Sequence, residues 1–359
     1  MKVKVCHIVG GIVGGGVEQV IANYCSMMSN IQFDLLYQYE PNQTCLEKLC
    51  KANINCIQIP SKKLHPIRHF LVLFMLLKKG RYDVVHSHLD WYLNWIVCFC
   101  ALLVGVKKRF SHHHHDYQEK TVACKILCEI LRFLNRLFAT HYLACSPQAA
   151  ISGWGLKTFK DGKIYVINNA MNLKKFEFDL ESRCRIRKEL DLEGKFCIGH
   201  VGRCCYQKNQ KFLVEIFSKI HKLKNNTVLI LVGDGPDKEY LKKRIDSMHL
   251  TDSVRFIEAQ ENVAPYYSAM DVFCLPSRWE GLGMVLVEAQ LNGLSCVASD
   301  TVPRSAQISN GVDFFNLANP GLWVSRICEM SKFDHSNVCN AKDFDIEFEC
   351  KVLEQLYCG

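Results

Sequence analysis

The chain has 359 residues, of which 49% are hydrophobic and only 22% are charged, a composition that excludes a disordered protein and indicates a folded globular one. Its length is long for one hydrophobic core and comfortable for two. The formal net charge of +8 is unevenly divided, because residues 1–172 carry 20 Lys and Arg against 10 Asp and Glu, whereas the remainder carries 24 against 26. The basic first half therefore favours an acidic partner or an anionic surface.

Two further features bear on the cellular compartment. The first ten residues form a short apolar strand that runs into glycines, without the cleavage site of a secretory signal, so we expect a cytoplasmic protein. The longest apolar stretch, residues 91–106, is shorter than the roughly 20 residues of a membrane-spanning helix and favours a buried helix. The 20 cysteines are spread along the chain without a Cys-x-x-Cys motif, so reduced thiols are expected.

Taken in chain order, the first half alternates short apolar strands with longer helical patterns. Strands are predicted at residues 3–9, 33–37, 56–59, 84–86 and 109–112. Helices are predicted at residues 17–28, 67–79 and 91–103. This βα alternation indicates a sheet of parallel strands.

A second series of the same kind follows residue 172. Strands are predicted at residues 196–201, 227–232, 254–257, 272–275 and 296–299. Helices are predicted at residues 209–222, 237–248 and 263–269, around Glu288, and near 344–357. The fold class is therefore α/β, with two doubly wound parallel-sheet domains and a ligand cleft expected between them. We predict an N-terminal domain over 1–172, a C-terminal domain over 173–340, and a helix in 341–359 that crosses back to the first domain.

Residues 120–140 predict a basic amphipathic helix. Lys125, Glu129, Arg132 and Arg136 form one helical stripe, and leucines and isoleucines occupy the other positions. Such a helix can present a solvated charged face, or it can lie on an anionic membrane. The helix alone favours the solvated face and the basic first half supports the membrane, so both interpretations stay open.

Two phosphate-binding patterns occur where a predicted strand leads into a helix. Gly14, Gly15 and Gly16 lie in the first, where exposed backbone N–H groups can meet an anion, a pattern that is weak by itself. In the second, Arg203 and Lys208 follow the strand at 196–201, and two cations at that place fit a diphosphate.

Glu280 and Glu288 lie eight positions apart around a short, mostly apolar helix. A carboxylate such as Glu288 needs donors when it is buried, and the hydroxyls of a ribose are suitable. Free N–H groups near Gly283 and Met284 could hold a phosphate one helical turn away. The spacing therefore suits a nucleotide.

Six histidines occur in two clusters, His-Ser-His at 86–88 and His-His-His-His at 112–115. Consecutive histidines on a strand point in different directions and no paired carboxylates accompany them, which argues against a metal site. A histidine that hydrogen-bonds a sugar or shares a proton is favoured, and His112 and His114 are the candidates.

In combination, these motifs resemble those of the retaining glycosyltransferases of family four, which have the GT-B fold of two Rossmann-like domains, in the branch that builds bacterial capsular polysaccharides and exopolysaccharides. The resemblance covers nearly the whole chain. It rests on Gly10-Gly11 through Glu18, Val-His-Ser-His-Leu-Asp at 85–90, Arg-Phe-Ser-His-His-His at 109–114, Ala-Cys-Ser at 144–146, Gly202-Arg203 with Lys208-Asn209, Leu-Val-Gly-Asp-Gly-Pro at 231–236, Ala-Met-Asp at 269–271, and Leu-Pro-Ser at 275–277 through Glu288-Ala-Gln290.

This resemblance implies a division of roles among the candidate residues. Arg203 and Lys208 would hold the donor diphosphate, Glu288 the ribose hydroxyls, and His112 or His114 the donor sugar or acceptor. The transferred sugar and its phosphate would meet Glu280 and the loop of Gly281, Leu282, Gly283 and Met284. The base would be framed by residues such as Gln260 and Val263, and Gly14, Gly15 and Gly16 would lie by the phosphates. Protein cations and helix ends would replace a metal, so neither metal nor cofactor is expected.

The implied reaction is transfer of a hexose from a nucleotide sugar, most simply a UDP-sugar, to a lipid-diphosphate-linked oligosaccharide. The partners would be that donor, that acceptor and the anionic inner face of the cell membrane, with no nucleic acid. The sequence departs from the family pattern at Val13-Gly14, Gly283 and Arg304, positions that surround the sugar and acceptor. The alternatives are a soluble acceptor, an epimerase, or a non-catalytic nucleotide-sugar-binding subunit, although intact Arg203, Lys208, Glu280 and Glu288 argue against the last.

Overall fold

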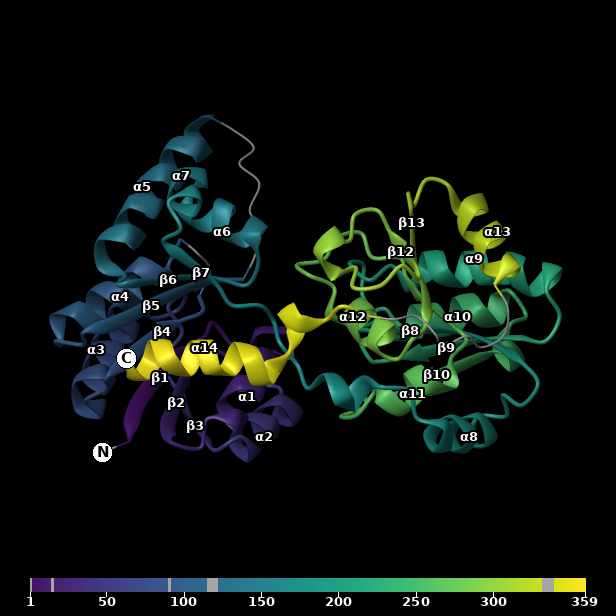
Figure 1. Ribbon diagram of the computed structural model, residues 1–359, viewed down its shortest axis with the longest axis horizontal. Helices are drawn as coiled ribbons and strands as arrows, with labels where there is room; N and C mark the ends of the chain where they lie inside the picture. Colours follow the sequence, from purple (N-terminus) through teal and green to yellow (C-terminus); the bar gives the residue numbers. More distant parts are fainter. Residues whose placement is uncertain (1, 14–15, 90–91, 115–121, 331–338) are drawn as a thin grey trace. The chain divides into compact units, whose positions relative to one another are not determined.

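The computed structural model describes residues 2–13, 16–89, 92–114, 122–330 and 339–359 (Figure 1). The chain divides into two compact units, one of residues 1–172 with 342–359, the other of residues 173–341. Each unit is built on its own parallel sheet, so the predicted α/β class is confirmed.

The sheet of the first unit has seven parallel strands in the order β3-β2-β1-β4-β5-β6-β7. The strands are β1 (Val3–Ile8), β2 (Ile31–Tyr37), β3 (Ile54–Gln58), β4 (Val84–Ser87), β5 (Lys108–His113), β6 (His141–Ala144) and β7 (Ile164–Val166). Because the chain runs outward from β1 in one direction and from β4 in the other, the topological switch point lies between β1 and β4.

Helices cover this sheet and divide its core in two. They are α1 (Gly16–Met27), α2 (Gln43–Lys51), α3 (Pro66–Gly80), α4 (Asn94–Leu103), α5 (Val122–Phe138), α6 (Pro147–Trp154), α7 (Leu156–Lys160) and α14 (Ile346–Cys358), with a 3-10 turn, η4, at Lys342–Phe344. One core cluster joins α1, α2 and α14 to the sheet, and another joins α3 and α4 to it. The last helix therefore completes the core of the first unit, with Tyr357 only 2% exposed.

The second unit has six parallel strands in the order β10-β9-β8-β11-β12-β13, with the switch point between β8 and β11. The strands are β8 (Phe196–Val201), β9 (Thr227–Val232), β10 (Val254–Ile257), β11 (Val272–Leu275), β12 (Ser295–Ser299) and β13 (Val312–Phe315). Its helices are α8 (Leu180–Glu189), α9 (Gln210–Leu223), α10 (Lys238–Ser247), α11 (Ala264–Ala269), α12 (Met284–Leu291) and α13 (Pro320–Glu329), with 3-10 turns η1 (Leu173–Phe176), η2 (Thr251–Ser253) and η3 (Arg304–Ala306).

Asp271, at the start of β11, connects this sheet to α8 through a buried ionic network. Its carboxylate lies 2.7 Å from Arg183 and 3.3 Å from Arg187, and it accepts a 2.8 Å hydrogen bond from the Cys197 backbone N–H of β8. Buried charge is tolerated here because each carboxylate oxygen has a cationic or N–H donor.

Helix α5 differs from the prediction in the face that it turns outward. Arg132 is 8% exposed, and its guanidinium donates to the Ser152 carbonyl at 2.6 Å, while Arg136 donates to the Trp154 carbonyl at 2.9 Å. The outward positions are apolar instead: Ile126, Leu127, Ile130, Phe133 and Leu137, each between 53% and 61% exposed. The expectation of an outward basic stripe was therefore wrong for its arginines, because α5 uses them to satisfy backbone carbonyls in the last turn of α6.

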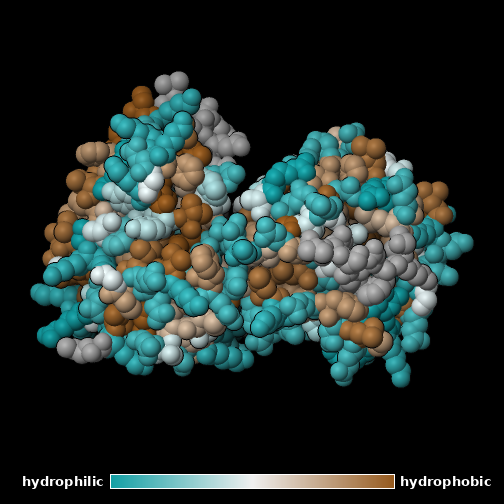
Figure 2. Space-filling model, in the orientation of Figure 1, coloured by the Kyte–Doolittle hydropathy of each residue, from teal (hydrophilic) through white to brown (hydrophobic). Residues whose placement is uncertain are grey.

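The apolar surface continues over the neighbouring helices. Exposed side chains on α3 and α4, which pack in the order α3-α4-α5, include Ile67, Leu71, Met75, Leu102 and Leu103. Figure 2 shows hydrophobic residues in brown along this edge of the first unit. No helix in the part of the chain that the structure describes is long and apolar enough to cross a membrane.

Candidate functional site

The predicted diphosphate and sugar residues of the second unit lie at its switch point. Arg203 and Lys208 follow β8, and Glu280 follows the neighbouring strand β11. Carboxyl ends of parallel strands meet at one edge of a sheet, and ligands of doubly wound sheets bind at this kind of crevice. Two loops distant in sequence thus bring cations and a carboxylate to one edge.

Glu280 is held by two donors. Lys208 Nζ lies 2.6 Å from Glu280 Oε1, and the Ser277 hydroxyl donates to the same oxygen at 2.5 Å. Both partners of the ion pair are largely buried, with side chains 16% and 7% exposed. Among the described residues the second oxygen, Oε2, has no hydrogen-bond donor, so it remains available to accept from a hydroxyl.

Glu288 lies on α12, one helical turn after Met284. The Tyr267 hydroxyl of α11 donates to Glu288 Oε2 at 2.8 Å. Burial raises the pKa of Glu288 above its usual value, while the Tyr267 hydrogen bond and the positive charges of Lys175 and Lys208 counteract that rise. The carboxylate is thus desolvated but accompanied by donors and cations, as a binding group for a polyhydroxyl ligand requires.

Helix α12 begins at a glycine that no other residue replaces easily. Gly283 is its N-cap with φ of 86°, and a Cβ there would lie 3.2 Å from a methyl group of Val302. The left-handed conformation turns the chain so that the first N–H groups of α12 remain without intrahelical partners. Met284 therefore starts a helix end that can receive an anion.

Other predicted donor residues are placed less tightly. Arg203 is exposed, and its guanidinium has no hydrogen-bond partner within the described ranges. Gln260 is exposed beyond the end of β10, and Val263 precedes α11 with partial burial. These three side chains border the strand ends without a contact that fixes them to Lys208 or Glu280.

The corresponding edge of the first unit begins with the glycine segment after β1. Gly16 is the exposed first residue of α1, whereas Gly14 and Gly15 lie outside the described residues. Glu18 is buried and accepts a 2.8 Å hydrogen bond from the Val13 backbone N–H. The glutamate therefore holds the end of this segment against α1.

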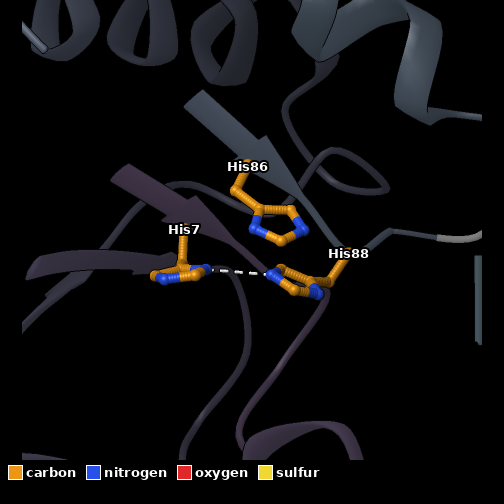
Figure 3. Close-up of side chains that lie close together, drawn as sticks. All are labelled: His7, His86 and His88. Carbon is orange, nitrogen blue, oxygen red and sulfur yellow. Dashed lines mark hydrogen bonds between the residues drawn. The ribbon is translucent and has the colours of Figure 1, made fainter. Parts of the chain in front are cut away.

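The predicted histidines belong to a buried cluster at the same edge. His7 comes from β1, and His86 and His88 come from β4 and its end, with His7 Nδ1 2.9 Å from His88 Nε2 (Figure 3). His88 Nδ1 lies 2.9 Å from His114 Nε2, and His86 Nε2 lies 3.3 Å from His112 Nδ1. Strand alternation places residues 112 and 114 on one face, which contains this cluster.

His113 points to the opposite face and stacks on Trp154, with ring centroids 4.6 Å apart. Burial lowers the pKa of His7 and of His113 to about 3, and burial with neighbouring imidazoles holds the pKa of His86, His88 and His112 well below the usual value. These five imidazoles are therefore neutral near pH 7. In the part of the first unit that the structure describes, no carboxylate stands among these rings.

Several residues of these sites were not identified from the sequence. Tyr267, Ser277 and Lys175 act on Glu288 or Glu280, and His7 and Tyr357 complete the histidine cluster. Ser277 lies in the same loop as Glu280, three positions before it, whereas each of the others comes from a different element than the residue on which it acts, so spacing in the chain carries no sign of those contacts. His112 and His114 lie in the first unit, while Lys208, Glu280 and Glu288 lie in the second.

Two parallel-sheet units with polar groups at the switch point of each define a GT-B protein, and comparison with solved structures confirms that fold. The structure of Anabaena HepE in complex with UDP and glucose matches with a TM-score of 0.78 at 17% identity, covering 98% of both chains.

Sequence comparison then shows which proteins the chain resembles. Residues 182–324 match the family model of glycosyl transferases group 1. EpsF of Bacillus subtilis (strain 168), named as a glycosyltransferase, is 27% identical over 336 residues that cover 90% of this chain and 86% of that protein. The UDP-Gal:alpha-D-GlcNAc-diphosphoundecaprenol alpha-1,3-galactosyltransferase of Escherichia coli is 26% identical over 88% of this chain and 84% of its own length. Residues 182–324 therefore form a group 1 glycosyltransferase domain, and the chain as a whole is similar to bacterial glycosyltransferases.

Proposed function

We propose that this glycosyltransferase moves a hexose from a UDP-sugar to a lipid-diphosphate-linked oligosaccharide, with retention of configuration at the transferred carbon, in the synthesis of a bacterial capsular polysaccharide or exopolysaccharide. The observation that carries the proposal is the convergence of Lys208, Glu280 and the Glu288–Tyr267 pair at the switch point of the second unit. The name of the E. coli relative includes alpha-D-GlcNAc-diphosphoundecaprenol, and one further relative, CapH of Staphylococcus aureus, is named for capsular polysaccharide biosynthesis.

The diphosphate of the donor is assigned to cations and a helix end. Lys208 lies 2.6 Å from Glu280, and because its ammonium has three N–H donors it can donate to a phosphate while it keeps this carboxylate. Arg203 and the first N–H groups of α12 supply further positive potential. These groups stabilise the charge that develops on the leaving nucleotide, so the proposed transfer needs no metal ion.

The ribose and the sugar are assigned to the two carboxylates. Glu288 uses Oε2 for Tyr267, and among the described residues no donor reaches Oε1, so a ribose hydroxyl can donate to it. Glu280 offers Oε2 to the hydroxyls of the transferred sugar while Lys208 and Ser277 hold Oε1. A glutamate restrained in this way positions the sugar and does not attack it.

In this scheme the configuration is retained because the nucleotide leaves and the acceptor attacks on the same face of the transferred sugar. The bond from the anomeric carbon to the diphosphate oxygen breaks, the acceptor oxygen bonds to that carbon from the same side, and the acceptor proton moves to the released phosphate. His112 or His114 would contact the sugar or the acceptor. The proton is thus taken by the leaving group, and the chain supplies orientation and charge stabilisation.

The lipid-linked acceptor is supported by the outward apolar face of α5. Its five exposed hydrophobic residues belong to the basic first half of the chain, and Lys125 lies exposed on the same helix. An apolar face with cations at its side suits the surface of an anionic membrane. We therefore assign peripheral attachment to the cytoplasmic face of the membrane, through the exposed apolar residues of α3, α4 and α5.

The assignment is tested by incubating the purified chain with a panel of UDP-, GDP- and ADP-sugars and a membrane extract of the native host, and measuring the released nucleotide diphosphate. We expect turnover with one UDP-sugar, reduced about 100-fold or more by Lys208→Ala or Glu288→Ala because each removes a group that binds the charged or hydroxylated donor. Unchanged turnover in both variants would contradict the site assignment, and turnover without membrane extract would favour a soluble acceptor.

A further inference from the structure

We propose that His88, His112 and His114 form a binding site for a divalent transition metal of the Zn²⁺ type at the edge of the first sheet. One ligand nitrogen from each of the three lies within 4.8 Å of the other two, and two of the three residues are buried. The β4–β5 register, in which Ser87 pairs with Ser111, sets His88 opposite His112. The sheet geometry itself therefore brings these rings together.

The ring nitrogens divide into two sets. The outer set would bind the metal, and the inner set consists of the second ring nitrogens of His88 and His112. His88 Nδ1 and His114 Nε2 face each other at 2.9 Å, and buried His112 Nε2 has no hydrogen-bond partner in the described part of the chain. A buried imidazole nitrogen without a partner is costly, since it has lost water and gained no donor or acceptor. A metal ion would satisfy it.

The inner nitrogens of His88 and His112 already have hydrogen-bond partners, which are the imidazoles of two further histidines. His88 Nε2 bonds His7 Nδ1 at 2.9 Å, and His112 Nδ1 lies 3.3 Å from His86 Nε2. His86 in turn bonds the Tyr357 hydroxyl at 2.6 Å. Metal-ligating histidines are oriented in this manner through their second ring nitrogen, so the supporting shell of the proposed site is present.

A neighbouring triplet, His7, His86 and His88, is less suited to the same role (Figure 3). Both nitrogens of His86 are engaged, by Tyr357 and by His112, and both nitrogens of His7 are engaged, by His88 and by the Cys25 thiol at 3.7 Å. The outer triplet includes His114, which is only partly buried, and an ion needs such a route from solvent.

The ligand set selects the class of metal. Imidazole suits Zn²⁺, Cu²⁺, Ni²⁺ and Co²⁺, whereas Mg²⁺ and Ca²⁺ require oxygen ligands. Zn–N bonds of about 2.0–2.1 Å in a tetrahedral site place the nitrogens about 3.3 Å apart, so on metal binding the 2.9 Å pair of His88 and His114 must open slightly and the nitrogen pairs nearer the 4.8 Å limit must close. Three protein ligands leave the fourth position to water or to an anion.

One consequence rests on the proposed function. A metal on His112 and His114 would withdraw both imidazoles from the sugar or acceptor, so metal occupancy is expected to inhibit transfer.

The metal site is tested with Co²⁺ as a spectroscopic probe of chelator-treated protein. We expect one equivalent of Co²⁺ to give the visible d–d spectrum of a tetrahedral nitrogen site without the charge-transfer band of a thiolate ligand, which matters because the chain has 20 free cysteines. His88→Gln and His114→Gln should lower the affinity at least about tenfold, whereas His65→Gln, an exposed residue of the same unit, should not change it.

A thiolate band, or an unchanged spectrum in both variants, would overturn the site. Zn²⁺ should also raise the thermal unfolding midpoint of the wild-type chain where Mg²⁺ does not, and equal effects of the two ions would overturn the site without reference to any variant. A separate experiment tests the effect on activity. Transfer is measured before Zn²⁺ is added, after it is added, and again with excess chelator. Binding without reversible inhibition would overturn only the assignment of His112 and His114 to the sugar or acceptor.

Discussion

Glu288 shows how one side chain can be both desolvated and ready to bind. Burial raises its pKa, and the Tyr267 hydroxyl, the largest opposing cause, lowers it. The ionised form is the one that accepts hydrogen bonds from a ribose diol. If Glu288 binds the ribose as proposed, donor affinity is linked to the ionisation of this residue.

We predict that Tyr267→Phe shifts the acid limb of UDP binding to higher pH. Loss of the 2.8 Å hydrogen bond removes a group that favours the carboxylate, so the pKa of Glu288 rises and protonation begins closer to neutrality. The measurement is the dissociation constant of UDP by titration calorimetry between pH 5 and 8.

The matched control is Tyr266→Phe, one position earlier, which should leave the profile of the wild type unchanged because no hydrogen bond from Tyr266 reaches Glu288. Identical pH profiles for the wild type and Tyr267→Phe would show that Glu288 does not govern donor binding.

The carboxylates and the cations of this site could be predicted from the sequence, because Glu288 interrupts an apolar run and Lys208 follows a strand. Tyr267 could not, since its contact with Glu288 depends on the packing of α11 beside α12, 21 positions away in the chain. The histidine cluster illustrates the same limit. A run of four histidines suggested divergent rings, yet the register of three strands returns alternate residues to one face.

At the scale of single elements, α12 depends on its N-cap. We predict that Gly283→Ala lowers the free energy of unfolding by about 1–2 kcal/mol, since a non-glycine residue at φ of 86° is strained and the new methyl group would lie 3.2 Å from Val302. Urea unfolding measures this change. Gly321→Ala, in the first turn of α13 with nothing within 4 Å of its Cβ, should stay within about 1 kcal/mol of the wild type. Equal losses in the two variants would refute a conformational role for Gly283.

Helix α5 gives a prediction on membrane attachment. Ile130→Asp with Phe133→Asp should reduce sedimentation with vesicles containing anionic phosphatidylglycerol by about tenfold or more, because two apolar side chains would otherwise enter the lipid. Both residues are more than half exposed, so the fold should tolerate the change. Leu223→Asp, an exposed leucine 72% accessible on the second unit, is the control. If Leu223→Asp reduced vesicle binding as much as the double variant does, the assignment of membrane attachment to α5 would be wrong.

For the whole molecule, the alternation of strands and helices made the two-sheet architecture predictable. Elements with a weaker pattern were not foreseen: α2, β6, α6, α7, β7, α8, β13 and α13. β7 has only three residues and α8 is predominantly charged, so neither shows a clear apolar period. They are held by contacts that the sequence does not display, as α8 is by the pairing of Arg183 and Arg187 with Asp271.

The two units differ in how many buried neutral histidines they contain, and this predicts unequal resistance to acid. The first unit has five with strongly lowered pKa values, namely His7, His86, His88, His112 and His113. In the described part of the second unit His200 is comparable, with burial lowering its pKa to about 4. A lowered folded-state pKa means that the unfolded chain takes up protons first as the pH falls below about 6.5, so stability is present above that pH and is lost below it.

We therefore expect the urea concentration at which the first unit unfolds to fall further than that of the second when the pH is lowered from 7.0 to 5.5, whereas a uniform weakening would lower both equally. Each buried histidine contributes a slope of at most about 1.4 kcal/mol per pH unit in that window, which lies above the usual range of carboxylates. The experiment equilibrates the chelator-treated chain in urea at each pH and applies a deuterium pulse at one common pH, with peptides of each unit resolved by mass spectrometry. His113→Gln should flatten the response of the first unit by about one proton, and exposed His65→Gln should not. An equal shift of both units would mean that the buried imidazoles do not control the acid stability of the fold.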